Sequence, residues 1–344
     1  MILLCYGTRP EWIKIKPLIE EFKKNNFEYR VLFTGQQVNI GEFEYDWILN
    51  IVDKPNRLDS IVSSITAQMW EVFNFFCKYN TETNKFIDAY VLVQGDTTSA
   101  LAVALSAFNH GIKVIHLEAG LRTHDRQNPY PEEINRKIIS QIADVNLCPT
   151  KEARQNLVDE KIYEDMFVVG NTVIDNLLPY KDKCEYGNII LVTLHRRENH
   201  HWMDQWFIEL EKLAIKYSQY DFVLPIHPNP NVMKHRDLLK YVNVAKPLPY
   251  DMLLNYLVRS RLVITDSGGL QEECSFFNKK CLVCRKVTER PEVLGKSSFM
   301  VSSPEDLSDV FMKHIDNYEI NYDCPYGDGH SAEKIMKALN EVML

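Results

Sequence analysis

Short apolar runs recur along the chain, and each is followed by a polar or glycine-rich turn and then by a segment with helical spacing of apolar residues. A continuous apolar run is typical of a strand buried on both faces, as in a parallel sheet. The amphipathic segments suit helices that cover such a sheet. The pattern therefore predicts an α/β fold. Strands are expected at residues 2–6, 31–34, 90–94, 114–117, 189–194, 222–226 and 262–265, and helices at about 12–25, 61–79, 99–109 and 331–344.

Polar residues follow three of the predicted strands in the first half. The three turns are Gly7-Thr-Arg, Gly95-Asp-Thr-Thr and Glu118-Ala-Gly-Leu-Arg. Ligands of open α/β sheets bind outside the carboxyl ends of the strands, so these turns are expected to converge on one crevice. A plainer interpretation is that Asp96 or Thr97 only caps the next helix, and that the acids after Pro131 are an ordinary helix start. The repetition favours a site.

Two turns have the features of a phosphate cradle. Gly7 lets the backbone approach a ligand, and Arg9 and Lys14 add positive charge beside the following helix. Ser267-Gly-Gly269 opens another helix and offers free amides at the positive end of its dipole, although a simple glycine turn would look the same. Neither turn is a Walker loop or a GxGxxG fingerprint, so neither a nucleoside triphosphate nor a dinucleotide is indicated.

Chain length predicts two domains, because 344 residues exceed the usual size of one core. The linkage is expected near residues 170–186. The N-terminal domain is then residues 1–170 together with the C-terminal helix 331–344, and the second domain is residues 171–330.

Charge and cysteine usage narrow the class of protein. A net charge of -8 argues against a nucleic-acid or anionic-membrane partner. No apolar stretch is long enough to span a membrane and Arg9 comes too early for a signal peptide, so a cytoplasmic protein is expected.

The eight cysteines are scattered, mostly in apolar runs, which predicts buried reduced thiols. Cys281 and Cys284 have the spacing of a redox or metal pair but fall in a strand-like run without a second pair, so no metal site is expected.

The motifs resemble one known family nearly end to end. Their order along the chain is specific, whereas any single motif would be weak. They are Gly7-Thr-Arg-Pro-Glu, Gln94-Gly-Asp-Thr-Thr, His116-Leu-Glu-Ala-Gly-Leu-Arg-Thr, Pro131-Glu-Glu-Ile-Asn-Arg, Gly170-Asn-Thr-Val-Ile-Asp, His195-Arg-Arg-Glu-Asn, Thr265-Asp-Ser-Gly-Gly-Leu-Gln-Glu-Glu, Thr288-Glu-Arg-Pro-Glu and Tyr326-Gly-Asp-Gly. In this set the chain is similar to the non-hydrolysing UDP-N-acetylglucosamine 2-epimerases.

This resemblance implies a fold and a reaction. The fold is the glycosyltransferase-B type, two Rossmann-like domains facing across a cleft, with the C-terminal helix crossing back onto the first domain. The reaction is reversible inversion at C2 of UDP-GlcNAc to UDP-ManNAc, by anti elimination of UDP to 2-acetamidoglucal and re-addition, for surface-polysaccharide precursors. Domain closure is the expected means of enclosing the intermediate. The resemblance implies no redox cofactor and no metal. It also implies that the protein is a homodimer and that its substrate is a UDP-sugar.

The family's functional residues carry over to this sequence by position. The catalytic residues implied are Asp96, Glu118, Glu132 and His195, and the residues implied to bind UDP or the rest of the substrate are Arg9, Lys14, Arg136, Ser267, Gly268, Gly269, Glu273 and Arg290. Which carboxylate takes the C2 proton stays open. His227 is a further candidate, but a structural histidine between prolines explains it equally well.

Departures from the family pattern keep alternatives open. Thr34-Gly-Gln-Gln37-Val-Asn-Ile lacks the usual histidine of a region that binds an activating second UDP-GlcNAc. Residues 251–253 lack the aromatic residue that relatives often place near the uracil. The residues after Glu292 differ from the usual glycine-rich sequence, and this difference could shift the specificity for the sugar. The alternatives are C2 epimerisation of another UDP-sugar such as a UDP-diacetamido uronic acid, and a hydrolysing variant that releases UDP. A glycosyltransferase and a UDP-sugar sensor without turnover are less consistent with three carboxylates and His195.

Overall fold

The computed structural model describes residues 1–37, 43–52, 55–83, 85–87, 89–316, 318, 320 and 322–343. These form two compact units, Met1–Asp175 with Gly329–Leu344, and Asn176–Asp328. Residues 38–40 of the segment that departs from the family pattern lie outside the described residues, so the expectation about the second UDP-GlcNAc is not addressed by the structure.

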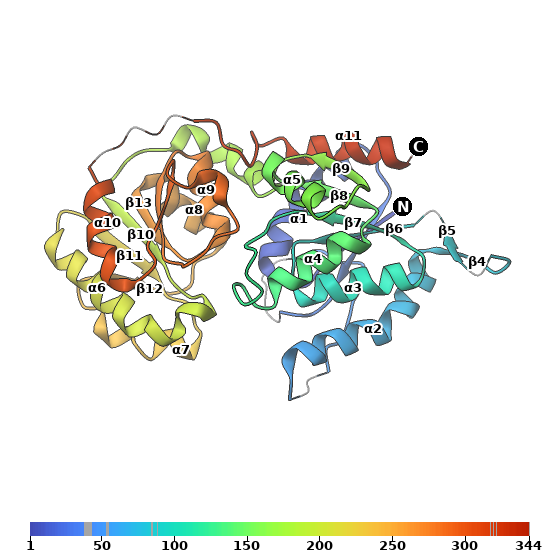
Figure 1. Cartoon of the computed structure of the whole chain (residues 1–344), viewed down its shortest axis with the longest axis horizontal. Coiled ribbons are helices and arrows are strands. Elements are labelled where there is room, and N and C mark those ends of the chain that lie inside the picture. Colours follow the sequence, from blue (N-terminus) through green and yellow to red (C-terminus); the bar gives the residue numbers. More distant parts are fainter. Residues whose placement is uncertain are drawn as a thin grey trace. The chain divides into compact units, whose positions relative to one another are not determined.

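Unit 1 is built on a parallel sheet, which has seven strands among the described residues (Figure 1). The strand order β3-β2-β1-β6-β7-β8-β9 places the strands that precede the three polar turns next to one another. The strands are β1 (Ile2–Tyr6), β2 (Tyr29–Phe33), β3 (Trp47–Ile48), β6 (Tyr90–Gln94), β7 (Lys113–Leu117), β8 (Val145–Cys148) and β9 (Asp165–Val168).

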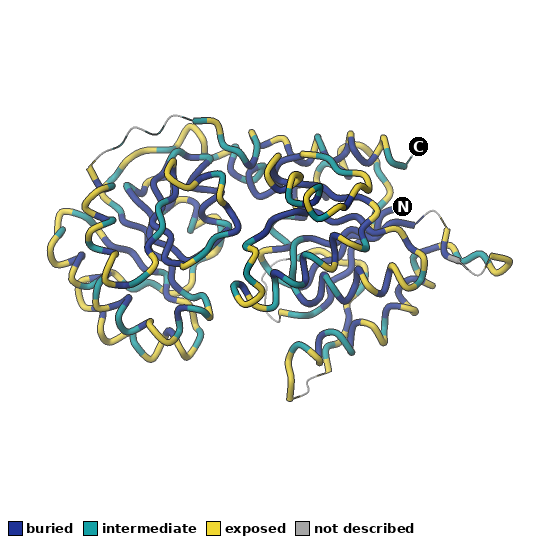
Figure 2. Tube along the Cα trace, in the orientation of Figure 1, coloured by how far each residue is buried: buried dark blue, intermediate teal, exposed yellow. Residues whose placement is uncertain are grey.

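Alternate residues of the unit 1 strands supply two separate cores. Leu3, Val91 and Val93 point to one face, where helices α2 (Arg57–Phe76) and α3 (Thr98–Asn109) pack. The other face is covered by α1 (Arg9–Lys24) and α11 (Ser331–Met343). The central strands β1, β6 and β7 are therefore buried on both sides, as their continuous apolar runs predict, and Figure 2 shows buried strands beneath helices whose outer surfaces are exposed. The remaining unit 1 helices are α4 (Glu132–Ile142) and α5 (Lys151–Asp159).

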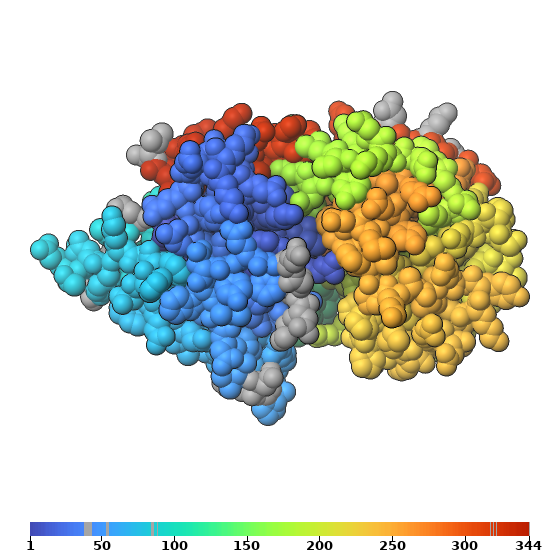
Figure 3. All heavy atoms as spheres, turned by 180° about the vertical axis from the view of Figure 1, so that it is seen from behind, coloured from blue at the N-terminus to red at the C-terminus, as the bar shows by residue number. Residues whose placement is uncertain are grey.

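The expected helix at residues 61–79 is wrong at both ends. Asn56 caps α2, because its side-chain oxygen accepts hydrogen bonds from the amides of Leu58 and Asp59, so the helix begins earlier. The helix ends at Phe76, because Cys77 is extended and leads into β4 (Lys78–Asn80). β4 pairs antiparallel with β5 (Lys85–Ile87) in a hairpin that projects from unit 1 (Figures 1 and 3).

Unit 2 repeats the same construction around a second parallel sheet, which has six described strands in the order β12-β11-β10-β13-β14-β15. One face of this sheet packs against α6 and α10 in a core that includes Trp206 and Phe311. The strands are β10 (Ile189–Thr193), β11 (Asp221–Pro225), β12 (Asn243–Ala245), β13 (Ser260–Thr265), β14 (Lys280–Val283) and β15 (Ser298–Met300). The helices are α6 (Met203–Lys216), α7 (Pro230–Met233), α8 (Tyr250–Arg259), α9 (Gly268–Phe276) and α10 (Leu307–His314). The α/β class with two Rossmann-like domains is thus confirmed.

The C-terminal helix α11 belongs to unit 1 although unit 2 precedes it in the chain. Its buried face, with Ile335 and Leu339, joins the core of α1 and β1. Its N-terminus is fixed by Asp175, whose two carboxylate oxygens accept hydrogen bonds from the amides of Ser331 at 2.9 Å and Ala332 at 2.8 Å. This capping ties the chain's return to the segment where the first unit ends.

Two smaller expectations can be checked directly. All eight cysteines are free, and six of them are buried, Cys281 and Cys284 included, which confirms the expectation of buried thiols. Within the described part of the chain, no helix combines the length and the apolar character that crossing a membrane requires.

Candidate active site

The three polar turns of unit 1 lie at the same edge of its sheet. β1, β6 and β7 are neighbouring parallel strands, so the turns after Tyr6, Gln94 and Leu117 emerge side by side. A Cβ atom built on Gly95 would lie 4.0 Å from Oε2 of Glu118, which places that carboxylate over the Gly95 turn. The convergence expected from the sequence is therefore what the sheet order produces.

Glu118 is held in an unusual backbone conformation at the end of β7. Its φ angle is +69°, a left-handed value that a residue with a side chain adopts at an energetic cost. Its carboxylate is buried and accepts hydrogen bonds from Lys14 of α1 and from Gln94 at the end of β6. Lys14, carried over as a UDP-binding residue, is therefore the ion-pair partner of a predicted catalytic acid in this structure.

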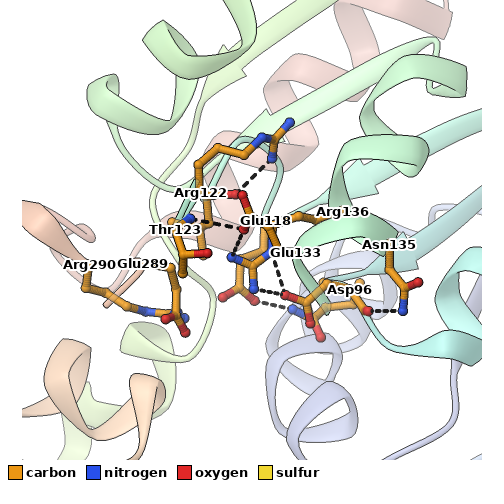
Figure 4. A network of polar contacts seen from close by, with 12 residues as sticks. Asp96, Glu118, Arg122, Thr123, Glu133, Asn135, Arg136, Glu289 and Arg290 are labelled. Carbon is orange, nitrogen blue, oxygen red and sulfur yellow. Dashed lines mark hydrogen bonds and ion pairs between the residues drawn. The ribbon is translucent and has the colours of Figure 1, made fainter. Parts of the chain in front are cut away.

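Asp96 is fixed by two consecutive residues of α4. Figure 4 shows the guanidinium of Arg136 directed at the Asp96 carboxylate, with Nε at 2.9 Å from Oδ2 and Nη2 bonded to the same oxygen. The side-chain amide of Asn135 donates to the backbone carbonyl of Asp96 at 2.9 Å. Arg136 is buried and Asp96 is partly exposed, and the two bonds from one guanidinium fix the orientation of the carboxylate. In this arrangement Arg136 contacts a predicted catalytic acid.

Glu132, which the resemblance implies is catalytic, and its neighbour Glu133 have different surroundings. Glu133 is fully buried, and its carboxylate accepts the amides of Thr123 and His124, both at 3.0 Å. It also pairs with Arg136 at 3.2 Å. Glu133 therefore anchors the loop that follows Glu118. Glu132 begins α4 and is half-buried.

Glu11 links the first two polar turns and was not among the predicted site residues. Its carboxylate accepts the amide of Gly7 and the hydroxyl of Thr8, both at 2.8 Å, and the hydroxyl of Thr97 at 2.7 Å. Burial raises the pKa of Glu11, and the hydrogen bond from Thr97 opposes that rise. Thr97 itself caps α3 by accepting the amide of Ala100. Thr97 therefore caps the helix, as the plainer interpretation predicted, whereas the carboxylate of Asp96 forms an ion pair with Arg136.

His116 supports the Gly95 turn from beneath. It is fully buried in β7, and its Nε2 lies 2.8 Å from the carbonyl oxygen of Gly95, to which it must donate. Nδ1 lies 3.4 Å from the hydroxyl of Ser140. Burial lowers the pKa of His116 to about 4, so the ring is neutral at pH 7. The apolar run Val-Ile-His-Leu gave no sign of this role, because the role depends on the adjacent strand.

In unit 2, His195 follows β10 and His227 follows the adjacent strand β11. The two rings are stacked, with centroids 5.2 Å apart and an interplanar angle of 14°. Burial lowers the pKa of both imidazoles, and each ring's neighbours include further positive charge. His227 accepts the amide of Asn229 through Nδ1 at 3.1 Å, which fits a structural role within its own loop.

The turn after β13 presents the start of α9, with Ser267 at the N-cap position. Gly268 is required by packing, because a Cβ atom there would lie 2.7 Å from Oε1 of Glu289 and 2.9 Å from Nη1 of Arg290. Gly269 has space around it, since the nearest atom to a Cβ would be Oγ of Ser267 at 3.9 Å. The amides at this helix N-terminus lie at the positive end of its dipole, which suits an anionic ligand.

Arg290 lies in a buried network of charges. Its guanidinium contacts Glu272 of α9 at 2.7 Å and also pairs with Glu289. Glu289 in turn pairs with Arg285 at 2.9 Å, and Arg285 contacts Glu198 at 2.7 Å. Sequence reasoning singled out Arg290 but not the network in which it lies. The network fixes the loop that carries Arg290 against the first turns of α9.

Each unit contains its own share of the predicted residues. Unit 1 contains Arg9, Lys14, Asp96, Glu118, Glu132 and Arg136, and unit 2 contains His195, Ser267, Gly268, Gly269, Glu273 and Arg290. Arg9 opens α1 and is half-buried. Glu273 of α9 accepts a hydrogen bond from the hydroxyl of Tyr250 at 2.8 Å. Among the described residues, no cluster of histidine, cysteine, aspartate or glutamate could hold a metal ion.

Chemically, unit 1 offers carboxylates for proton transfer and unit 2 offers an imidazole and a helix N-terminus. Carboxylates and histidine are the usual general acids and bases, and amides with cations stabilise the charge of a departing phosphate. The groups of unit 1 therefore suit removal of a weakly acidic proton, and those of unit 2 suit the binding and departure of a phosphorylated group.

Comparison with known proteins agrees with this chemistry. A family profile described as UDP-N-acetylglucosamine 2-epimerase matches residues 20–340. A UDP-N-acetylglucosamine 2-epimerase of Campylobacter jejuni is 36% identical, with 98% of this chain and 97% of the relative aligned. The crystal structure of the Neisseria meningitidis UDP-GlcNAc 2-epimerase bound to UDP-GlcNAc is similar with a TM-score of 0.87 at 32% identity, covering 99% of both chains. The Methanocaldococcus jannaschii UDP-GlcNAc 2-epimerase in complex with UDP-GlcNAc and UDP gives a TM-score of 0.79 at 28% identity, covering 99% of both.

Proposed function

We propose, because this chain belongs to the UDP-N-acetylglucosamine 2-epimerase family, that it interconverts UDP-GlcNAc and UDP-ManNAc by inverting C2 of the sugar. The observation that carries the proposal is the group of acids at one sheet edge of unit 1. Asp96 and Glu118 follow adjacent strands, and each is held by a cation on a neighbouring helix. The N. meningitidis relative, bound to UDP-GlcNAc, supports the choice of substrate.

The reaction divides into two balanced halves. In the first, a carboxylate takes the proton from C2, the electron pair of that C–H bond forms the C1–C2 double bond, and the C1–O bond breaks with its electrons leaving on UDP. In the second, UDP adds back to C1 while C2 receives a proton on the opposite face. We assign the acid and base roles to Asp96, Glu118 and Glu132, since a positioned carboxylate can take a proton as a general base and return one as a general acid.

The diphosphate is assigned to cations and amides. The N-terminus of α9 with Ser267, Gly268 and Gly269 is the proposed cradle, since the backbone amides of a helix N-terminus and the helix dipole both favour an anion. In this structure the amide of Ser267 donates to Oγ1 of Thr265 at 2.9 Å. Arg9 and Lys14 of α1, with Arg136 and Arg290, are assigned as cationic contacts of the substrate. Because Lys14, Arg136 and Arg290 are engaged with carboxylates in this structure, any such contact requires them to share or exchange partners.

His195 is assigned as the catalytic histidine and Glu273 as a contact of the UDP portion. His195 has a pKa lowered by burial, so it is neutral near pH 7 and can either donate or accept a proton. Glu273 already binds the hydroxyl of Tyr250. No cofactor enters the proposal, because elimination and re-addition involve no net oxidation.

We also propose that the enzyme works as a homodimer in the cytoplasm. The free cysteines suit a reducing compartment. α2 and α3, which pack together, carry the exposed aromatic side chains Trp70, Phe75 and Phe108, and such apolar surface is typical of a protein interface. Light scattering after size-exclusion chromatography would test the dimer, and a mass of one chain at micromolar concentration would contradict it.

The activity is tested by incubating the purified chain separately with UDP-GlcNAc and with UDP-ManNAc plus a trace of UDP-GlcNAc. Anion-exchange chromatography should give the same mixture of both sugars from either side. Free UDP with free ManNAc would instead identify a hydrolysing enzyme. Turnover confined to a UDP-diacetamido uronic acid would identify the other substrate class.

Single variants connect the activity to the acids. Asp96→Asn, Glu118→Gln and Glu132→Gln should each lower kcat by about 10²- to 10⁴-fold, the usual contribution of a general acid or base. Glu152→Gln, on the exposed surface of α5, is the matched control and should retain activity. Wild-type rates in all three variants would contradict the assignment.

A further inference from the structure

A buried carboxylate of unit 2 has one oxygen without a hydrogen-bond partner. Asp266 follows β13, and no part of it is exposed to solvent. Among the described residues, none donates a hydrogen bond to its Oδ1 atom. A buried unsatisfied carboxylate oxygen is costly, so its presence in a folded protein calls for an explanation.

The other oxygen of Asp266 is saturated and fixes the loop after β10. Oδ2 accepts the backbone amide of His195 at 2.9 Å and that of Arg196 at 2.8 Å, and the side-chain amide of Asn199 at 3.1 Å. Asn199 also donates to the carbonyl of Cys284 at 2.9 Å, beyond the end of β14. Three donors at one oxygen leave the Asp266 carboxylate only one orientation.

The unsatisfied oxygen faces the imidazole of the same loop. Nδ1 of His195 lies 3.5 Å from Oδ1 of Asp266, slightly beyond an ordinary hydrogen bond. A small rotation of the half-buried ring would close this distance. The backbone amide of Arg196 donates to Oδ2 and therefore does not supply a hydrogen bond to Oδ1.

We propose that Asp266 is a positioning residue that holds His195 with its proton on Nδ1 and leaves Nε2 free to exchange a proton with the substrate. One carboxylate oxygen fixes the backbone of the His195 loop, and the other sets the orientation and tautomer of the ring. A carboxylate behind a catalytic histidine acts in this way in other enzymes, where it also stabilises the imidazolium that forms during the reaction. The inference rests on the proposed function, because it assigns a partner to the proposed catalytic histidine.

The other groups around His195 fit this arrangement. His227 stacks on one face of the ring, and Nδ1 of His227 accepts an amide hydrogen bond, which a protonated ring would lose. Nε2 of His200 lies 3.1 Å from the carbonyl oxygen of His195, and Arg196 is adjacent in the chain. Burial lowers the pKa of His195, Asp266 raises it, and Arg196 and His200 lower it further. Of these groups only Asp266 favours the imidazolium form.

The decisive variant is Asp266→Asn, because its effect on the ring follows from the contacts of Oδ2. Three N–H groups donate to Oδ2 of Asp266, so the oxygen of the asparagine amide must occupy the position of Oδ2. The NH₂ group of the asparagine then takes the position of Oδ1 and faces Nδ1 of His195. Nδ1 then becomes an acceptor and the proton moves to Nε2. The loop keeps its acceptor, so the fold is expected to survive, as circular dichroism would verify.

The experiment is nitrogen NMR of the full chain with labelled histidine, in which the two-bond couplings report which ring nitrogen is protonated. His195→Asn identifies the signal. We expect the proton on Nδ1 in the wild type and on Nε2 in Asp266→Asn, with Asp309→Asn, an exposed matched change on α10, identical to the wild type. A wild-type His195 with its proton on Nε2 overturns the proposal, and so does the same tautomer in both proteins. This measurement needs no turnover, so it remains valid if the proposed function is wrong.

Activity supplies a second, independent test. We expect Asp266→Asn to lower kcat by up to about 10⁴-fold with little change in KM, the loss that follows when the carboxylate behind a catalytic histidine is replaced by an amide. In a protein that already carries His195→Asn, the further change Asp266→Asn should lower kcat by no more than about twofold, because Asp266 acts through the imidazole ring that is then absent. Independent, multiplicative effects of the two changes would contradict this role, as would an unchanged kcat in Asp266→Asn.

Discussion

At the scale of single residues, the geometry of the candidate site depends on side chains that fix the turns and the carboxylates of the site by hydrogen bonds. His116 donates to the carbonyl of Gly95 at 2.8 Å, Glu11 joins the first two turns, and Arg136 fixes Asp96. Since His116 and Glu11 are buried, their protonation states affect both the geometry of the site and the stability of unit 1.

His116 should make the free energy of unfolding depend on pH. Its pKa is about 4 in the folded chain against about 6.5 when unfolded, so the unfolded state binds more protons between these values. Stability is therefore complete above pH 6.5 and is lost as pH falls toward 4, by about 2 kcal/mol at pH 5.

Urea denaturation at pH 7 and pH 5 measures this loss in the wild type and in His116→Gln. Other buried histidines contribute in both proteins, so the difference between their pH dependences isolates His116. The variant should lose about 2 kcal/mol less than the wild type between the two pH values. Equal losses would mean that His116 is not held neutral.

At the scale of elements, α4 carries two adjacent glutamates with separate tasks. Glu133 is fully buried between Arg136 and the amides of Thr123 and His124, whereas Glu132 is half-buried at the first position of the helix. Breaking a buried pair leaves an uncompensated charge and is strongly destabilising.

Glu133→Gln is therefore expected to lower the free energy of unfolding by about 3 kcal/mol, while Glu132→Gln lowers activity with little effect on stability. Thermal unfolding and turnover of the two variants, made in parallel, measure both effects. The reverse pattern, with Glu132→Gln unstable and Glu133→Gln intact, would show that the roles are exchanged.

The elements also show what a sequence can predict. Continuous apolar runs identified the central strands β1, β6, β7, β10 and β13 because those strands are buried on both faces. β3 was missed because it is short, and β9 and β12 were missed because most of their residues are partly or fully exposed, so neither shows a buried apolar run. The polar turns were expected together because neighbouring parallel strands place them together. Glu133 and Asp266 were not singled out, since their importance depends on backbone amides that no residue pattern reveals.

At the scale of the whole molecule, the proposed site residues are divided between two Rossmann-like units. Unit 1 contains the proposed catalytic carboxylates, and unit 2 contains His195 and the helix N-terminus of α9. The family resemblance of the motifs is confirmed by the match over residues 20–340 and by relatives aligned along nearly their whole length. The assignment of each site residue remains a prediction for the variants above.

The most direct test of the account follows the C2 proton. Elimination requires that this proton leave the sugar, so it can be replaced from solvent before UDP adds back. Proton NMR of the purified chain with UDP-GlcNAc in deuterated water should show loss of the C2 proton signal as UDP-ManNAc accumulates. UDP-ManNAc that keeps its original C2 proton would contradict elimination, and a spectrum that stays unchanged would contradict the proposed activity itself.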